Sequence, residues 1–220
     1  MRLYKLVTQD GTTHGGTTWE IGKTNYATGV GMEMCTSDLL HAYTDPLLSV
    51  LLNPIHANIS NPMLYEVEVP EVVATDSGIK VGAKSMTAVK QLPIPIVTKE
   101  QRIIFGIYCA MSVYTDENWI KWADDWLIGK DRSNSSAASA SAASASAAVF
   151  ASAASAAASA AAYAAAHAAY AAYAAYAAYA AYAAYAAYAA SHAAYAASHA
   201  AYAYDLSEMM LITCAYAAIG

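Results

Sequence analysis

The chain has 220 residues, of which 58% are hydrophobic and 13% are charged, and its formal net charge is −6. All eleven Lys and Arg residues lie at or before Arg132, so this acidic chain lacks the basic stripe that gives affinity for phosphate backbones, and we do not expect nucleic acid as a direct ligand. The three cysteines, Cys35, Cys109 and Cys214, are odd in number and far apart, and no apolar run follows the basic N-terminal residue; both features favour a reducing interior without export.

The first third of the chain predicts strands followed by a short helix. RLYKLVT alternates as a strand does, and DGTTHGGTTWEIGKT is typical of a turn, a short strand and a second turn. Asp45 followed by Pro46 is a helix-start signature, and the apolar LLSVLLN is expected to continue the helix for about two turns, until Asn53 and Pro54 stop it. LYEVEV then alternates strictly, and GIKVGAKSMTAVKQLPIPIV predicts one or two further strands.

Two helices are predicted between residues 98 and 129. Thr98 and Gln101 form a capping box at the start of the first helix. The second begins near Asp116, places three tryptophans on one face, and ends where Gly129 is suited to a C-terminal cap. We interpret these tryptophans, Trp119, Trp122 and Trp126, as core residues rather than as a cofactor site.

A low-complexity tract follows these helices. From Ser133 to Tyr204 there is no charged residue, Gly or Pro, and the centre repeats AAY. Alanine has the highest helix propensity, so helix is expected. The predicted fold class is therefore an α+β head, a small β-rich domain with short helices, followed by an all-α, alanine-rich helical tail. The predicted domains are a head at 1–132, the Ala/Ser/Tyr tract at 133–204 and a C-terminal apolar segment at 205–220.

The aromatic residues of the tract are candidates for self-association, because small alanine surfaces allow helices to approach closely while the rings pack between them. The alternative is a spacer helix with little packing. A membrane-spanning tail is disfavoured, since a phenol at every third position would lie in the hydrocarbon layer. The tyrosines wind around the helix in the centre of the tract, whereas the later 4-3-4-3 spacing matches a coiled-coil seam. The self-association candidates are Tyr170, Tyr173, Tyr176, Tyr179, Tyr182, Tyr185, Tyr188, His192, Tyr195, His199 and Tyr202.

Three segments of the head, LYKLVTQDGTTHGGTTW, HAYTDPLLSVLLNPIHANISNPMLYEVEV and TKEQRIIFGIYCAM, together resemble an uncharacterised family of bacteriophage and prophage proteins with Ala-rich AAXAAX tails. The resemblance covers residues 1–132, and the tail by composition. It implies an accessory protein made in the host cytoplasm, and it carries no known catalytic residues.

Few head residues have the spacing of a chemical site. His14, Cys35, His41 and His56 have atoms that can ligate a metal, but no pair has the CxxC or HxxxH spacing of a metal site, so no metal or other cofactor is expected.

A second candidate site lies on the LYEVEV strand. Glu66 and Glu68 project from the same face and could supply a general base and a stabilising carboxylate, or be ordinary surface acids. This element after a β-rich start is similar to the ADP-ribosyltransferase order, with Lys5 where that family has an arginine and GGTTW in place of Ser-Thr-Ser.

The most strongly non-random feature of the sequence is architectural, and it favours a non-enzymatic phage accessory interaction or assembly protein. Its partners would be another protein, a second copy of the chain, or both, and its Ala/Tyr tail would mediate packing or self-association. The alternative is a small transferase-like or nucleotide-binding enzyme that uses Glu66 and Glu68. Whether the protein is an enzyme stays open at this point.

Overall fold

The computed structural model describes all residues except 77–79, 149–159, 166–190, 194, 197–198 and 201–207. The chain divides into two compact units, Met1–Ile96 with Ser207–Ile212, and Val97–Leu206 with Thr213–Gly220. The first is called here the β-rich unit and the second the helical unit, and each is described by itself.

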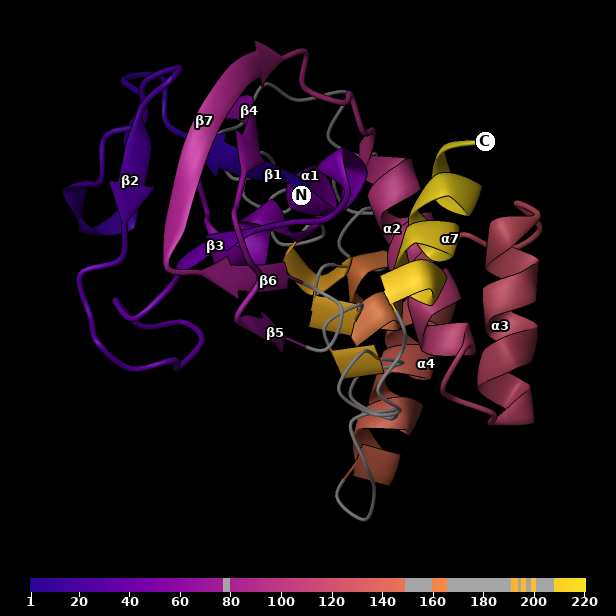
Figure 1. The fold of residues 1–220 in the computed structure, drawn as a ribbon. Coiled ribbons are helices and arrows are strands. Elements are labelled where there is room, and N and C mark those ends of the chain that lie inside the picture. Colours follow the sequence, from indigo (N-terminus) through magenta and orange to yellow (C-terminus); the bar gives the residue numbers. More distant parts are fainter. Residues whose placement is uncertain (77–79, 149–159, 166–190, 194, 197–198, 201–207) are drawn as a thin grey trace. The chain divides into compact units, whose positions relative to one another are not determined.

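Among its described residues, the β-rich unit contains two antiparallel sheets, the helix α1 and the first part of α7 (Glu208–Ile219) (Figure 1). The four-stranded sheet has the order β1-β4-β7-β2, and the three-stranded sheet has the order β3-β6-β5. The elements in chain order are β1 (Arg2–Val7), the 3₁₀ turn η1 (His14–Gly16), β2 (Thr24–Tyr26), β3 (Leu40–Ala42), α1 (Pro46–His56), β4 (Met63–Glu68), β5 (Ala74–Asp76), β6 (Lys80–Ala83) and β7 (Ser85–Leu92).

The strands predicted from RLYKLVT and LYEVEV are confirmed as β1 and β4, and one face of the large sheet lies in a hydrophobic core. In the antiparallel register Leu3 lies opposite Val67 and Lys5 opposite Tyr65, so these side chains share a face. The core on this face also receives side chains from the small sheet. Its buried members are Leu3, Val7, Trp19, Ala42, Tyr65, Val67, Val69, Val81, Ala83, Met86 and Ala88.

Helix α1 begins as the sequence predicts. The Asp45 side chain accepts hydrogen bonds from the backbone N–H groups of Leu47 and Leu48, and Pro46 occupies the first turn. The predicted end at Asn53 and Pro54 is wrong, because the helix continues to His56. A proline in the last turn removes only one backbone hydrogen bond, so the helix tolerates it there.

The helical unit is built on α2 (Lys99–Met111), α3 (Glu117–Leu127) and α4 (Asn134–Ala148), and it includes the C-terminal part of α7 (Glu208–Ile219). The predicted capping box at the start of α2 is confirmed, and so is the predicted start of α3 near Asp116, whose side chain caps the helix by accepting from the Trp119 N–H. Gly129 follows α3 with φ +75°, a left-handed conformation that favours glycine.

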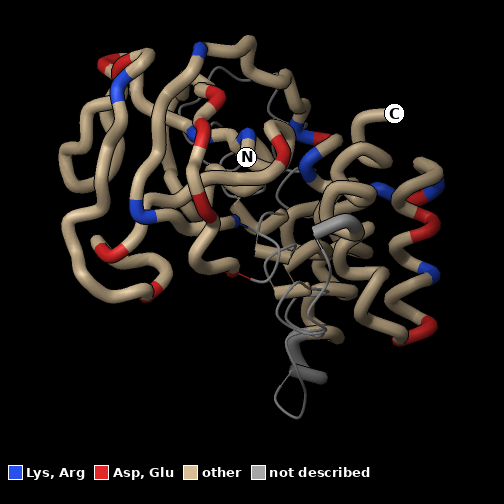
Figure 2. The backbone as a smooth tube through the Cα atoms, in the orientation of Figure 1, with Lys and Arg blue, Asp and Glu red and all other residues tan. Residues whose placement is uncertain are grey.

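Helix α3 is amphipathic, as predicted. Its buried residues are Trp119, Trp122, Ala123 and Trp126. Figure 2 shows that charged residues of both signs occur along this helix. The apolar face allows α3 to pack against both α2 and α4.

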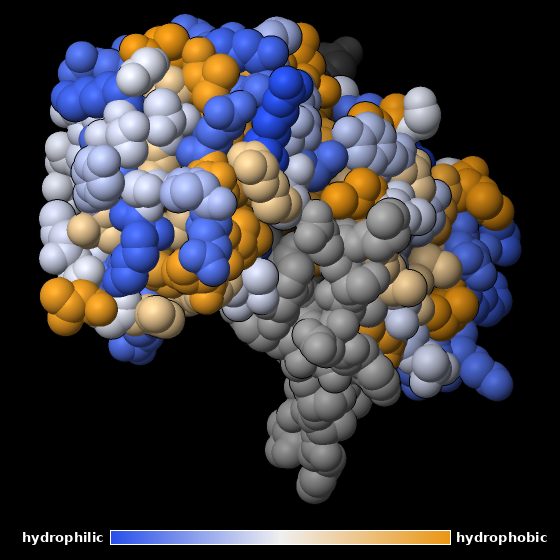
Figure 3. Space-filling model, viewed as in Figure 1, coloured by the Kyte–Doolittle hydropathy of each residue, from blue (hydrophilic) through white to orange (hydrophobic). Residues whose placement is uncertain are grey.

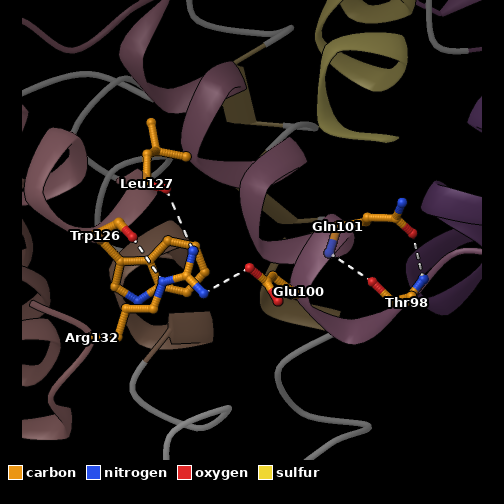
Figure 4. A network of polar contacts seen from close by, with 6 residues as sticks. All are labelled: Thr98, Glu100, Gln101, Trp126, Leu127 and Arg132. Atoms are coloured by element: carbon orange, nitrogen blue, oxygen red, sulfur yellow. Dashed lines mark hydrogen bonds and ion pairs between the residues drawn. The ribbon is translucent and has the colours of Figure 1, made fainter. Parts of the chain in front are cut away.

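Arg132 closes the connection between α3 and α4 (Figure 4). Its guanidinium lies over the Trp126 ring, 4.5 Å from the centroid, and its Nε donates to the Trp126 carbonyl at 2.9 Å. Its Nη1 donates to Glu100 Oε1 at 2.7 Å, which joins the start of α2 to the end of α3. The Arg132 side chain therefore links the start of α2, the end of α3 and the connection that leads to α4.

The fold class expected from the sequence is wrong. Helices are interspersed with the strands, since α1 lies between β3 and β4, and the head is two sheets followed by helices that group with part of the alanine tract. An all-α alanine tail is not evident among the described residues, where the tract contributes α4 and short helical stretches at 160–165, 191–193, 195–196 and 199–200.

The physical reason is the small size of alanine. At Gly106 of α2 an added Cβ would lie only 3.1 Å from Ala193 Cα, so the backbone of the tract at Ala193 packs directly on the backbone of α2. The sequence reveals high helix propensity, but alanine also allows close packing on almost any neighbour, and this packing brings part of the tract into the helical unit.

None of the helices in the described part of the chain combines the length and the apolar character needed to cross a bilayer.

Candidate functional site

Residues 27–39, between β2 and β3, form a loop that is called here the 27–39 loop. One lysine side chain holds this loop through hydrogen bonds. The ammonium of Lys84 donates hydrogen bonds to the carbonyls of Gly29, Gly31 and Asp38, the last at 3.0 Å. The Asp38 carboxylate in turn accepts from the backbone N–H of Glu33. A charged donor shared by three carbonyls holds the loop more firmly than neutral hydrogen bonds do.

Glycines let the loop close on itself and on the small sheet. A Cβ at either Gly29 or Gly31 would overlap the Asp38 side chain. At Gly82 of β6, a Cβ would collide at 2.7 Å with both Met34 Sδ and Leu39 Cδ1, so the missing side chain makes room for the two apolar anchors of the loop. The loop is therefore an ordered element of the β-rich unit.

This ordered loop presents apolar side chains to solvent. Val30 is 100% exposed and Met32 is 68% exposed, and Ile21 and Tyr26 are exposed just before the loop. Figure 3 shows hydrophobic atoms on the surface of the β-rich unit in the region where Figure 1 places the loop. Single exposed apolar residues are common on protein surfaces, whereas two such residues held on an ordered loop make that loop a candidate contact surface.

A polar cluster lies where the base of the loop meets β3 and β6. Cys35 donates its backbone N–H to His41 Nε2 at 3.0 Å, and its Sγ accepts from Lys80 Nζ, also at 3.0 Å. Lys80 forms an ion pair with Asp76 at 3.5 Å. From the neighbouring sheet, Lys5 Nζ donates to the His41 carbonyl at 2.6 Å and lies 4.7 Å from the Trp19 ring centroid.

Burial keeps several groups near this cluster uncharged. Burial, followed by the positive charges of Lys5 and Lys80, lowers the pKa of His41 to about 4. Burial and then Lys80 lower the pKa of His56 to about 4 as well. Neutral imidazoles can accept hydrogen bonds, which agrees with the bond from the Cys35 N–H to His41 and with the 2.7 Å contact between Tyr43 Oη and His56 Nδ1.

The same electrostatics act on two further groups. Burial lowers the pKa of Lys5 to about 8. Burial, with smaller effects of Asp76 and Cys35, raises the pKa of Tyr43 well above its usual range. At neutral pH the Lys5 ammonium therefore lies near neutral imidazoles and a neutral phenol.

The four metal-ligand candidates of the sequence are only partly brought together. Cys35 and His41 are hydrogen-bonded neighbours, and His56 stacks on Tyr43 with ring centroids 6.0 Å apart. His14 is exposed on η1, where its Nε2 is 3.0 Å from the carbonyl of Ala57. In the described part of the chain, no three His, Cys, Asp or Glu side chains are grouped as ligands for a metal ion.

The structure separates Lys5 from the carboxylates that the transferase resemblance groups with it. Glu66 lies opposite Tyr4 in the register of β1 and β4, whereas Lys5 lies opposite Tyr65. Because successive strand residues point to opposite faces, Lys5 and Glu66 lie on opposite faces of the sheet. Their side chains do not meet in one site.

Glu66 forms two ion pairs across the sheet. Its side chain is 7% exposed, and its two oxygens pair with Arg2 Nε at 3.4 Å and Lys90 Nζ at 3.2 Å. Glu68 is exposed at the end of β4. Both oxygens of Glu66 are thus engaged by cations, a geometry that stabilises the sheet.

Three self-association candidates lie in the described part of the tract. The rings of His192 and Tyr195 have centroids 6.2 Å apart, and those of Tyr195 and His199 are 6.3 Å apart, so the three form one row. Tyr163 packs edge-on against His192 at 4.5 Å. Burial lowers the pKa of His199. The other candidates, Tyr170, Tyr173, Tyr176, Tyr179, Tyr182, Tyr185, Tyr188 and Tyr202, lie outside the described residues.

The helical unit also has a groove of about 460 Å³ lined by α3 and α4, with Tyr114, Lys121 and Asp125 on its rim. Trp119 and Trp122 contribute to its lining. Their indole N–H groups are buried and have no hydrogen-bond acceptor among the residues that the structure describes. These N–H groups offer no exposed donor to a ligand in the groove, so the 27–39 loop is the stronger candidate for a binding site.

Sequence reasoning missed the residues that build the loop site, above all Lys80, Lys84 and Asp76. Lys80 is 45 residues from Cys35, and Lys84 is 46 residues from Asp38. No local spacing marks such pairs. The sequence did contain one indication of the loop, the Gly-rich TGVG segment before Cys35. This segment indicates a tight loop, but it does not indicate which distant side chains contact that loop.

Comparison of the chain with known protein families, with curated proteins and with solved structures gives no match.

Proposed function

We propose that this protein is a non-enzymatic interaction protein that binds a protein partner through the 27–39 loop. The proposal rests on one observation. Lys84 holds the loop through hydrogen bonds to three of its carbonyls, while the side chains of Val30 and Met32 remain 100% and 68% exposed. Folding gains nothing from exposing them, whereas a partner that buries them gains the hydrophobic free energy of both.

A fastened loop also lowers the entropic cost of binding. A mobile loop must be ordered when the partner binds, and each side chain that is immobilised costs about 0.5–1.5 kcal/mol. Here Gly29, Gly31 and the Asp38 backbone are already held in the free protein. The partner expected is a protein with an apolar pocket wide enough for one valine and one methionine side chain.

The resemblance of residues 1–132 to a phage and prophage family supports an accessory role during phage growth, with the host cytoplasm as the place of action. The three free thiols support the same compartment, because cytosolic thiols are kept reduced. The row formed by His192, Tyr195 and His199 supports self-association as a second contribution, since Tyr195 is 47% exposed.

The test of the loop is a double variant, Val30→Ser with Met32→Ser, compared with Ile128→Ser. Ile128 is an exposed hydrophobic residue, 74% exposed, and it lies in the other unit. If each loop side chain contributes about 1.5 kcal/mol when buried, the double variant should bind its partner about a hundredfold more weakly. Crosslinking from position 30 in host cells would identify the partner, and titration of that partner with the three proteins would give the affinities. Equal affinities for all three would refute the proposal.

The test of self-association is sedimentation velocity of the full chain at neutral and mildly acidic pH. The association should weaken as the pH falls below about 6, because protonation would place charge on the half-buried His192 and His199. The double variant His192→Ala with His199→Ala should remove that response. An oligomeric state that is the same at both pH values would show that this row is not an interface.

A further inference from the structure

In the β-rich unit, Cys35 of the 27–39 loop is in side-chain contact with Lys80 of β6. Their Sγ and Nζ atoms are 3.0 Å apart, across 45 residues of sequence. The Lys80 side chain is 11% exposed, and Asp76, at 3.5 Å, holds the ammonium in place. The nitrogen therefore has little freedom to leave the sulfur.

The sulfur itself is held and reachable. Cys35 has a left-handed backbone, φ +64°, and its N–H is bonded to His41, so the backbone that carries the sulfur is held in place. Cys35 is exposed, whereas Cys109 and Cys214 are both buried. A small oxidant dissolved in water can therefore reach one of the three thiols of the chain directly.

We propose that Cys35 and Lys80 form a peroxide-sensitive site in which oxidation joins the two side chains by a sulfur–nitrogen bond. In the first step the sulfur attacks one oxygen of hydrogen peroxide. The S–O bond forms as the O–O bond breaks, the departing hydroxide takes a proton from the Lys80 ammonium, and the thiol proton passes to solvent. Cys35 becomes a sulfenic acid, water is released, and the sulfur has been oxidised by two electrons while peroxide has been reduced.

The second step follows from the proton transfer in the first. Lys80 is now a neutral amine in contact with an electrophilic sulfur, and its lone pair attacks that sulfur. The S–N bond forms, the S–O bond breaks, and hydroxide leaves with the proton that the nitrogen loses, as a second water. Two groups already in contact react with a high effective concentration, so closure competes with further oxidation of the sulfenic acid.

The sulfur–nitrogen bond would link the loop covalently to β6, in addition to the hydrogen bonds that Lys84 already makes to the loop. It would also be reversible. A small thiol attacks the sulfur, releases the Lys80 amine and forms a mixed disulfide, and a second thiol then frees Cys35 while the two small thiols leave as their own disulfide. The site is thus an oxidation-dependent lock on the loop, and it does not depend on what the loop binds.

The experiment treats the purified full chain with hydrogen peroxide and maps the products by peptide mass spectrometry, with and without dimedone to trap sulfenic acid. The wild type should yield a crosslinked pair of peptides, one containing Cys35 and one containing Lys80, lighter by two hydrogen atoms and separated by a thiol reductant. Cys35 should react at least about tenfold faster than the two buried cysteines.

Two variants test the second step, formation of the sulfur–nitrogen bond, separately from oxidation of Cys35. Lys80→Arg keeps the positive charge but lacks a nucleophilic amine, so dimedone should trap Cys35 and no crosslink should form. Lys23→Arg, which changes an exposed lysine of the same unit paired with Glu20, should crosslink as the wild type does. Circular dichroism of each variant checks folding, and the wild-type peptide map decides the question if Lys80→Arg does not fold.

Three results would overturn the proposal. One is a Cys35 that reacts no faster than Cys109 and Cys214. Another is a wild type that goes from sulfenic to sulfinic acid without a crosslink to Lys80. The last is a folded Lys80→Arg variant that still gives the lighter peptide pair.

Discussion

Acid should destabilise the β-rich unit through two histidines. The folded-state pKa of both His41 and His56 is lowered to about 4 by burial and neighbouring positive charge, whereas an unfolded histidine titrates near 6.5. Between these values the unfolded chain binds more protons than the folded chain. The free energy of unfolding therefore falls as the pH falls through this window, and above it the contribution to stability is fully present.

The size of the effect follows from the linkage. Each histidine loses about 1.4 kcal/mol per pH unit within the window, so from pH 7 to pH 5 the pair would lose about 4 kcal/mol. Both rings are only half-buried, and solvent screening reduces this to about 2 kcal/mol. The window stops at pH 5 because carboxylates begin to titrate below it.

The assay is urea unfolding at pH 7 and pH 5, followed by hydrogen exchange with mass spectrometry so that residues 1–96 are read separately. His41→Gln with His56→Gln should abolish most of the pH dependence of this unit. His14→Gln, a change at an exposed histidine of the same unit, should leave it intact. A wild-type unit that is equally stable at both pH values would refute the argument that the two imidazoles are held neutral.

Three further changes test the packing. Gly106→Val should destabilise the helical unit by about 2 kcal/mol or more in thermal unfolding, because an added Cβ already lies 3.1 Å from Ala193 Cα. Arg132→Ala should cost about 1–2 kcal/mol in urea, and Arg132→Lys should recover little of it, because the contacts in Figure 4 use a planar guanidinium. Glu66→Gln with Glu68→Gln should change the free energy of unfolding by less than about 1 kcal/mol, because the cations paired with Glu66 are more than half exposed.

Each of these predictions has a contradicting outcome. A Gly106→Val protein as stable as the wild type would mean that the alanine tract does not pack on α2 in solution. Full recovery by Arg132→Lys would show that charge alone is used at that position. A loss of several kcal/mol in the double glutamine variant would show that the ion pairs of Glu66 are central to the sheet.

Local signals in the sequence determined where several elements begin and end. Asp45 with Pro46 starts α1, and Thr98 with Gln101 starts α2, as expected from side chains that cap exposed backbone N–H groups. Gly129 ends α3 because glycine adopts a left-handed conformation without strain. These effects act within four residues of the chain, so no knowledge of the fold is needed to detect them.

Only the tertiary structure decided the site and the place of the alanine tract. Lys80 and Lys84 contact residues of the 27–39 loop that are more than 40 positions away in the sequence. Local sequence spacing does not reveal which lysine will contact the Cys35 sulfur and which will donate to the loop carbonyls. The Ala-rich sequence indicated high helix propensity, because propensity is a property of each residue, and in the described part of the tract helix is found in α4 and in short stretches. It did not determine the neighbour of that helix, because alanine packs closely on many surfaces; the bare backbone of Gly106 supplies the surface on which Ala193 lies.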